Sequence, residues 1–363
     1  MSIENIPAEM ILFFIIYGVT GAIPLIAAIY LLLRRSNAFA PGVTPPLRLR
    51  IWTASFFAVS TLGHVWWYLF YVYSGDIHSP YYVLVAVFDC ALLLITIAGT
   101  LLSMLQDRKR PVWPILVALL PVVPFGVLHL FSSDDLIMSV ATIYILTFYV
   151  LFSAYVAYSA WRYGQWLNEN FADLENKKVW LIQLVSLFCL LLIILYALVE
   201  TDMVLMYLLH VIGLVVYILL LWRVETLPKL ELPVQAQPQQ APAVPANIDM
   251  SQVEQLLAEH CVNTQLYLQH DLTLQQLAQS VGTNRFYLSQ YFSRQGITYN
   301  TYINNLRINH FISRYNELSQ AEQPIVAQQL ASESGYRSYS TFSLAFKQRM
   351  GQSVTAWMRQ SAE

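Results

Sequence analysis

Seven long apolar stretches dominate the first 222 residues and restrict what this part of the chain can fold into. A transmembrane helix needs about 20 mainly apolar residues, and helices suit a bilayer because their backbone groups are hydrogen-bonded internally. The stretches lie at roughly 10–33, 51–73, 81–105, 112–131, 136–161, 179–200 and 203–222. The whole chain is 57% hydrophobic and 12% charged, against about a quarter charged in soluble proteins. We therefore predict an all-α chain that begins with a seven-helix transmembrane bundle, residues 1–225.

The connections between these stretches differ in charge. All 12 Lys and Arg residues of this half follow odd-numbered stretches: Arg34, Arg35, Arg48, Arg50, Arg108, Lys109, Arg110, Arg162, Lys177, Lys178, Arg223 and Lys229. The connections after even-numbered stretches carry only acidic charges: Asp76, Asp134, Asp135, Glu200 and Asp202. Lys and Arg are retained on the cytoplasmic side of a membrane. We therefore predict a multi-pass protein with its N-terminus outside and its C-terminus in the cytoplasm.

Few ionisable side chains fall inside the apolar stretches. His64, Asp89 and His210 do, and each lies about eight to ten residues from the outer surface, so the three share a depth. An ionisable group in lipid is costly unless it is paired or hydrated, so an Asp89–His pair could line a membrane pocket open to the outside. Hydrogen bonding between helices, which would fix their packing, is the other interpretation. The sequence leaves both open.

The sequence offers no pattern for catalysis or metal binding. Cys90, Cys189 and Cys261 are far apart and fit neither a metal site nor a disulfide framework. We find no nucleophile motif, and no internal repeat with paired broken helices of the kind that marks secondary transporters. Pro121 and Pro124 should bend the fourth stretch. We expect no catalytic residues, no metal and no cofactor.

The composition changes abruptly after the last apolar stretch. Residues 228–247 contain five prolines and four glutamines and cannot bury a core. Such a chain is extended, at about 3.1 Å per residue, and would reach up to roughly 60 Å. We predict a cytoplasmic linker over residues 226–248 that acts as a spacer, followed by a separate domain over residues 249–363.

The last domain contains one local pattern twice. The first copy has Leu277-Ala278, then Gly282, then an apolar face that includes Leu288. The second has Leu330-Ala331, then Gly335, then an apolar face that includes Phe342 and Phe346. A short amphipathic helix, a glycine turn and a second amphipathic helix form a helix-turn-helix. Thr273 and Gln276 form a capping box for the first copy, and Asn284 can cap its second helix.

A longer pattern comes from both copies and from the helix between them. It consists of Leu277-Ala278, Gly282, Tyr287-Leu288-Ser289, Tyr291-Phe292, Tyr302-Ile303, Leu306-Arg307-Ile308, Gly335-Tyr336-Arg337-Ser338, Phe342, Phe346-Lys347 and Gly351. In these residues, the region 251–358 resembles the DNA-binding domain of the AraC/XylS family of bacterial transcription regulators. The resemblance implies two recognition helices about one duplex turn apart, each entering a major groove. Together with the predicted membrane spans, it implies a bacterial inner membrane as the location.

The resemblance also implies which side chains contact DNA. They are Arg285, Phe286, Tyr287, Ser289 and Gln290 on the first recognition helix, and Arg337, Ser338, Tyr339, Ser340, Ser343 and Lys347 on the second. Arg285 and Gln290 suit guanine or adenine edges, and Lys347 suits a phosphate. Leu344 stands where family members often carry a base-contacting arginine. We therefore expect the first helix-turn-helix to do most of the base reading.

Charge is segregated within this domain. Residues 247–363 hold eight basic and eight acidic side chains, yet no acidic residue occurs between 272 and 316 or between 334 and 362. Positive charge therefore gathers around both predicted recognition helices, as phosphate contact requires. Because the domain is not basic overall, we expect modest affinity for DNA in general and a homodimer that strengthens it.

These features favour a membrane-embedded, sequence-specific transcription regulator rather than an enzyme. In this interpretation the seven-span domain senses a membrane or extracytoplasmic signal and controls the cytoplasmic domain. The alternatives are a transporter or receptor with a regulatory DNA-binding tail, and an inert membrane tether for the regulator. The expected partners are double-stranded DNA at a promoter or operator, the lipid bilayer and a second copy of the chain. RNA polymerase and an unknown small-molecule or lipid signal are further candidates.

Overall fold

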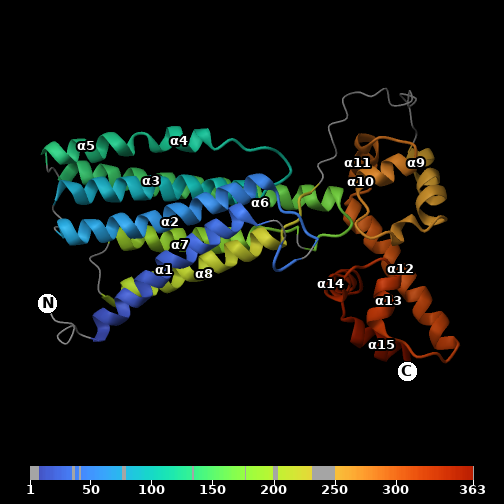
Figure 1. The fold of residues 1–363 in the computed structure, drawn as a ribbon. Coiled ribbons are helices and arrows are strands. Elements are labelled where there is room, and N and C mark those ends of the chain that lie inside the picture. Colours follow the sequence, from blue (N-terminus) through green and yellow to red (C-terminus); the bar gives the residue numbers. More distant parts are fainter. Residues whose placement is uncertain are drawn as a thin grey trace. The chain divides into compact units, whose positions relative to one another are not determined.

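The computed structural model describes residues 8–34, 37–40, 42–75, 79–132, 135–175, 177–198, 203–230 and 250–362. The elements in these ranges are helices, and one isolated antiparallel bridge pairs Phe171 with Thr273. The all-α prediction is therefore confirmed for this part of the chain. The chain divides into two compact units (Figure 1). Unit 1 comprises Met1–Tyr163 and Val179–Leu230, and unit 2 comprises Gly164–Lys178 and Glu231–Glu363.

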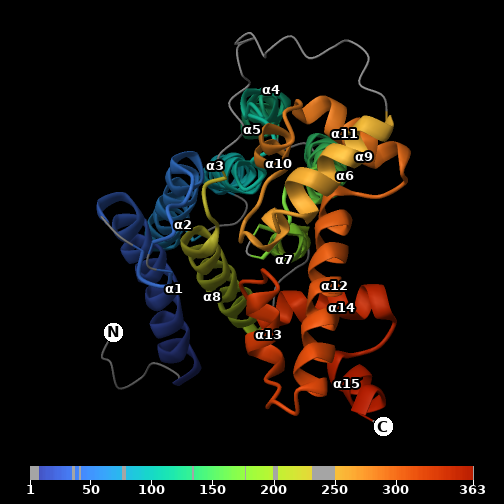
Figure 2. The same ribbon diagram turned by 90° about the vertical axis from the view of Figure 1, so that its right-hand side faces the viewer.

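Unit 1 is a bundle of apolar helices. They are α1 (Ala8–Leu33), α2 (Leu47–Tyr73), α3 (Pro80–Ser103), α4 (Trp113–Leu119), α5 (Val122–Ser132), most of α6 (Asp135–Asn170), α7 (Trp180–Leu198) and α8 (Met203–Thr226). Helix α2 packs between α1 and α3, and α8 packs against α1 and α7 (Figure 2). The fourth apolar stretch, for which a bend was predicted, is interrupted: α4 stops at Leu119 and the chain resumes as α5 just after Pro121.

Three described helices, and not the seven predicted, are long and apolar enough to cross a membrane. The candidate spans are Met10–Leu33 in α1, Ser139–Asn170 in α6 and Leu205–Thr226 in α8. Two further described apolar regions are shorter than a span. They are Phe88–Ser103 in α3, and Trp113–Leu128 in α4 and α5. Helix α2 is long, but it begins with two arginines and is rich in polar aromatic side chains. Some side chains of α7 do not belong to the part of the chain that the structure describes.

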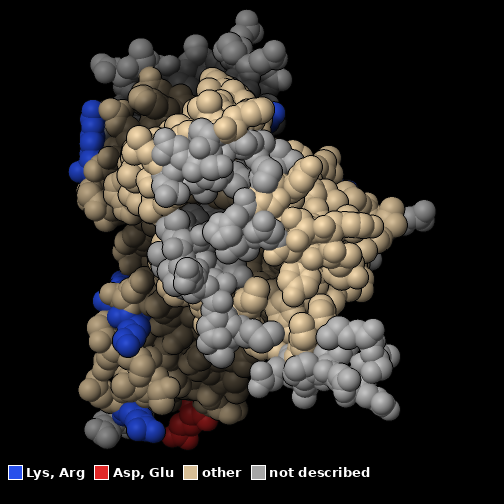
Figure 3. Space-filling model, turned by 90° about the vertical axis from the view of Figure 1, so that its left-hand side faces the viewer, with Lys and Arg blue, Asp and Glu red and all other residues tan. Residues whose placement is uncertain are grey.

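Unit 1 exposes a large apolar surface. The side chains of Ile26, Leu33 and Phe131 are 66%, 75% and 86% exposed. The face drawn in Figure 3 is mostly uncharged over the described helices of unit 1. Basic side chains gather where α1 ends and α2 begins: Arg34 pairs with the buried Glu225, and Arg48 donates to the carbonyl of Arg110. Large exposed apolar surfaces mark contact with a membrane or another protein.

Part of the predicted linker is held within unit 1. The Gln106 side-chain amide donates to the Pro228 carbonyl at 2.9 Å and accepts from the Leu230 N–H at 2.8 Å. Leu227 is fully buried. The rest of the predicted linker, residues 231–248, lies outside the described residues, as do the predicted outer charges at Asp76, Asp134, Glu200 and Asp202.

Unit 2 contains two small cores that share one helix. Its helices are α9 (Met250–Leu257), η2 (Ala258–Val262), η3 (Leu266–Leu268), α10 (Leu274–Ser280), α11 (Arg285–Arg294), α12 (Tyr299–Gln320), α13 (Ala327–Glu333), α14 (Tyr339–Met350) and α15 (Val354–Ala362). The first half of α12 contributes Tyr299 and Ile303 to a core with α10 and α11. The second half contributes Ile308, Phe311 and Tyr315 to a core with α13 and α14. Helix α12 is therefore the axis of the domain.

Candidate nucleic-acid interface

The first helix-turn-helix is fixed by local hydrogen bonds. The Thr273 hydroxyl accepts from the Gln276 backbone N–H at 3.2 Å, and the Gln276 side-chain oxygen accepts from the Thr273 N–H at 2.9 Å. These reciprocal bonds confirm the predicted capping box at the start of α10. Gly282 turns the chain with a φ of 74°, a conformation that glycine adopts easily. The Asn284 carboxamide oxygen then accepts from the Tyr287 N–H at 3.0 Å, and α11 begins.

Helix α11 has one buried and one outward face. Leu288 and Phe292 are 0% and 2% exposed and fill the first core, as predicted. The predicted contact residues lie elsewhere on the helix: Phe286 and Gln290 are exposed, and Arg285, Tyr287 and Ser289 are partly buried. Phe286, at 70% exposed, is a large apolar side chain open to solvent, where it is available to a thymine methyl group.

The second helix-turn-helix follows the same plan. Gly335 makes the turn with a φ of 88°, and the Ser338 hydroxyl caps α14 by accepting from the Thr341 N–H at 3.3 Å. Gly351 ends the helix with a φ of 73°. Among the predicted contact residues, Arg337, Ser340 and Lys347 are exposed, and Ser338, Tyr339 and Ser343 are partly buried. Leu344 is 54% exposed, so this departure from the family pattern lies on the outside of α14.

Arg307 joins the two helix-turn-helix structures. Its side chain is 1% exposed, and its Nε and Nη2 atoms donate to the carbonyls of Tyr267 and Gln269 at 2.7 and 2.8 Å. Its guanidinium lies 5.4 Å from the ring centre of Tyr336, in the turn of the second structure. Burial lowers the pKa of Arg307. Arg307 lies in the first stretch without acidic residues, where we expected positive charge to gather around a recognition helix, but it is a core residue and does not add to that surface.

Two of the predicted contact arginines have acidic neighbours. Arg337 Nη2 lies 2.6 Å from the Asp271 carboxylate, although the Arg337 side chain is 63% exposed. Burial lowers the pKa of Arg285, and the negative charge of Glu169 acts in the opposite direction. Asp271 directly precedes the acid-free stretch, whereas Glu169 comes from a distant part of the sequence, at the end of α6.

Residues 277–360 match a family model described as a helix-turn-helix domain. They form an AraC-type DNA-binding domain. The matched region runs from α10 to α15 and contains both recognition helices, α11 and α14. No curated protein and no solved structure matches the chain. In the structure the DNA-binding domain begins earlier, because Val253, Leu257 and Cys261 are part of its first core.

The contacts of the ionisable residues of unit 1 differ from the Asp89–His pair of the pocket interpretation, which the sequence left open beside hydrogen bonding between helices. His64 Nε2 lies 3.0 Å from the Thr20 hydroxyl, and the His64 and His210 rings are 5.8 Å apart between centres. Asp89 instead accepts from the indole N–H groups of Trp66 and Trp67 at 3.2 and 3.0 Å. The proximity of these tryptophans to Asp89 could not be seen without the fold.

Each of these polar groups has a protein partner, which favours inter-helix packing over a ligand pocket. The ring centre of Tyr17 lies 4.8 Å from that of His64 and 5.5 Å from that of His210, and the Tyr17 hydroxyl donates to the His64 carbonyl at 2.6 Å. Tyr17 therefore belongs to this cluster and was missed from the sequence. Within the described residues, no group of His, Cys, Asp or Glu side chains is placed to hold a metal ion.

Proposed function

We propose that this protein is a membrane-embedded, sequence-specific transcription regulator. The observation that carries the proposal is an AraC-type DNA-binding domain in one chain with a helical bundle that has three candidate spans. In this proposal unit 1 senses a membrane or extracytoplasmic signal and controls the DNA-binding domain, which lies in the cytoplasm. Low net charge in residues 247–363 supports a homodimer, in which a second copy adds DNA contacts.

The proposal makes α11 the principal reader of base sequence. Gln290 is exposed on α11, and Arg285 is partly buried at the start of this helix. The guanidinium donors of Arg285 suit a guanine edge, and the side-chain amide of Gln290 suits an adenine edge in a major groove. Helix α14 presents Lys347 for a phosphate and the apolar Leu344 near the same surface, so it would position the domain more than read bases. The two helices would therefore contribute unequally to specificity.

We expect Arg285→Ala and Gln290→Ala each to weaken binding to the specific site by about 1–3 kcal/mol, because each removes a base contact. Lys347→Ala should weaken binding to all sequences about equally and reduce the slope of log affinity against log salt by about 1. The measurement is a titration of the full-length chain, in detergent micelles, on DNA selected from a random library.

Two exposed residues away from the recognition helices supply matched controls. Gln323→Ala and Arg359→Ala remove the same kinds of side chain and should leave affinity for the selected site unchanged. If Arg285→Ala and Gln290→Ala bind as these controls do, α11 does not read bases. If neither the full-length chain nor its 247–363 fragment, fused to a dimerising segment, protects a site in footprinting, the DNA-binding proposal fails.

The membrane location rests on the surface of unit 1. Its exposed apolar side chains would be solvated by lipid, and its basic side chains gather at one end of the bundle. Basic ends of membrane helices stay on the cytoplasmic side, which would place the ends of α1 and α8 there. The chain that follows α8 leads to the DNA-binding domain, so this orientation would give that domain access to DNA.

We expect the full chain to remain in the membrane fraction after an alkaline carbonate wash, as an integral protein does. A fluorescent protein fused after Glu363 should be bright, whereas alkaline phosphatase at the same place should be inactive, because it needs an oxidising compartment. Recovery of the chain in the soluble fraction, or an active phosphatase fusion, would contradict the proposed location and orientation.

A further inference from the structure

A stretch distant in sequence completes the fold of the DNA-binding domain. Residues 164–178, which we call the docking segment, consist of the last turns of α6 and the loop that follows, and they belong to unit 2. The chain enters this segment from Tyr163 and leaves it at Val179, and both of those residues belong to unit 1. The docking segment is therefore covalently joined to unit 1 at both of its ends.

Backbone hydrogen bonds anchor the docking segment to the first helix-turn-helix. Phe171 forms the antiparallel bridge with Thr273, and the Ala172 N–H donates to the Leu272 carbonyl at 3.1 Å. The side-chain amide of Asn300, in the first turn of α12, donates to the carbonyls of Phe171 and Ala172 at 3.1 and 2.7 Å. Ala172 is 2% exposed and is part of the first core. The segment is thus packed into the domain.

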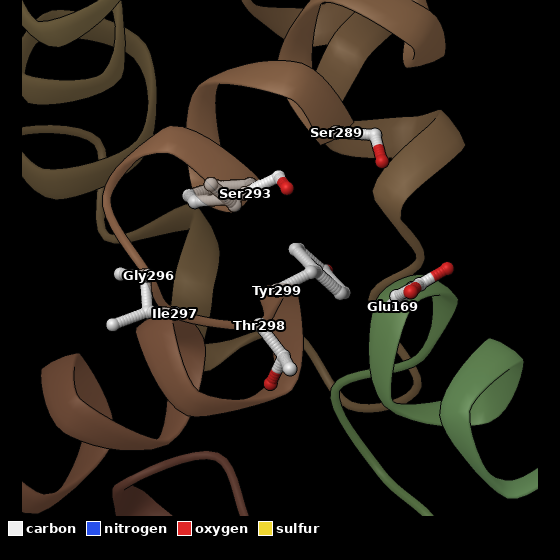
Figure 4. Close-up of a pocket in the computed structure, with 8 residues that line it drawn as sticks. Glu169, Ser289, Ser293, Gly296, Ile297, Thr298 and Tyr299 are labelled. Atoms are coloured by element: carbon white, nitrogen blue, oxygen red, sulfur yellow. The ribbon is translucent and has the colours of Figure 1, made fainter.

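One carboxylate of the docking segment faces the first recognition helix. Glu169 lines a pocket of about 260 Å³ together with Ser289 and Ser293 of α11. Figure 4 shows Glu169 on α6, on the opposite side of this pocket from Ser293. The negative charge of Glu169 also acts on Arg285, one turn before Ser289. Arg285 and Ser289 are both predicted DNA contacts, so an acidic side chain lies beside the surface that would meet DNA.

A second carboxylate reaches the second recognition helix. Glu175 Oε2 accepts from the Thr341 hydroxyl at 3.4 Å, in the first turn of α14. The Lys177 ammonium lies 3.3 Å from one Asp271 carboxylate oxygen, and Arg337 lies 2.6 Å from the other. The docking segment therefore contacts the N-terminal turn of α14 directly and, through Asp271, shares a charge network with Arg337. N-terminal turns are the parts of recognition helices that meet base edges.

We propose that the docking segment is a gate on the DNA-binding surface, which duplex DNA must displace in order to bind. DNA carries about one negative charge per 1.7 Å of its axis, so it and the carboxylates of Glu169 and Glu175 compete for the same basic and hydroxyl groups. The inference rests on the proposed function and names the step at which DNA binding would be regulated. A rearrangement of α6 or α7 in unit 1 would pull on the segment and open the gate.

A disulfide can lock the gate closed. Paired residues of an antiparallel bridge have Cα atoms about 4.5–5.5 Å apart, within the range that a disulfide spans. In the full-length double variant Phe171→Cys/Thr273→Cys, in detergent micelles, the oxidised form should bind the selected DNA roughly tenfold or more weakly than the same sample after reduction. Oxidised and reduced wild type is the control for the native cysteines, which include the partly buried Cys90 and the buried Cys261.

Neutralising the gate should have the opposite effect. Glu169→Gln/Glu175→Gln in the full chain should bind the selected DNA at least about threefold more tightly than wild type, because two charges that compete with phosphate are gone. The matched control, Glu259→Gln/Glu322→Gln, makes the same change in net charge at exposed positions outside the segment. Only the Glu169→Gln/Glu175→Gln variant should bind the selected DNA more tightly than this control variant does.

The outcomes separate the gate from the DNA-binding proposal. Equal affinity of the locked and reduced forms would overturn the gate while leaving DNA binding in place. Tighter binding by the locked form would also overturn it, because the docked segment would then support the DNA-binding conformation. If no form of the chain and no 247–363 dimer binds DNA, the proposed function fails and the gate with it. Tenfold weaker binding on locking, restored by reduction, is the supporting result.

Discussion

Replacing Gly335 by alanine is expected to destabilise the DNA-binding domain by about 2–5 kcal/mol. A residue with a Cβ at the Gly335 φ of 88° costs about 1–2 kcal/mol, and forcing an extra methyl into a packed site adds about 1–3 kcal/mol. A Cβ built at Gly335 would lie 2.8 Å from the Leu268 carbonyl oxygen and 2.9 Å from its Cα. Hydrogen exchange of the full chain, followed in peptides from α12 to α14, measures the loss.

The turn glycine of the first helix-turn-helix is the matched control. Gly282 has a φ of 74°, but a Cβ there would meet nothing within 4 Å. Gly282→Ala should therefore cost only the conformational part, about 1–2 kcal/mol. Equal losses for the two variants would mean that the turn of the second helix-turn-helix does not pack tightly against η3. A large loss of stability in Gly335→Ala alone would show that the close contact lies between this turn and η3.

Replacing Arg307 by methionine is expected to cost about 3 kcal/mol and to uncouple the two helix-turn-helix structures. Methionine fills much of the same space but cannot donate to the carbonyls of Tyr267 and Gln269, and buried acceptors without donors cost about 1–3 kcal/mol each. It also lacks the charge that lies over Tyr336. Hydrogen exchange should rise in η3 and in the turn at Gly335 together.

Arg314→Met provides the comparison for Arg307→Met. Arg314 lies on the same helix and pairs with Glu317, but the two side chains are 40% and 59% exposed. An exposed pair contributes no more than about 1 kcal/mol, so this variant should stay close to wild type. DNA binding gives a second readout. Arg307→Met should lose more affinity for a complete operator than for its first half, because it loosens the spacing between α11 and α14.

The local features of the DNA-binding domain could be predicted from sequence because they are formed by neighbouring residues. The capping box of Thr273 and Gln276 spans three positions, and the turns at Gly282 and Gly335 are set by a conformation that glycine favours. The interruption between α4 and α5, where a bend was predicted, is equally local. Each depends on interactions within a few residues.

Features made by distant residues could not be predicted. Arg307 is a charged residue in a stretch without acidic residues, and its partners are 40 and 38 positions away. The docking segment gave no signal beyond two lysines, because its contacts with Asn300 join residues 129 and 128 apart. Hydropathy located the apolar stretches of unit 1 but not where each helix begins and ends within them, and three described helices are long and apolar enough to cross a membrane. Packing decides such features.

The docking segment also changes what a cut in the chain would achieve. Cleavage anywhere between Leu230 and Met250 would break the peptide connection that runs from α8 to the DNA-binding domain. The two fragments would still share one hydrophobic core, with Ala172 supplied by one and Leu272 and Tyr299 by the other. A protease acting at that stretch would therefore not by itself release a soluble regulator. Liberation would require both the cut and the opening of the gate.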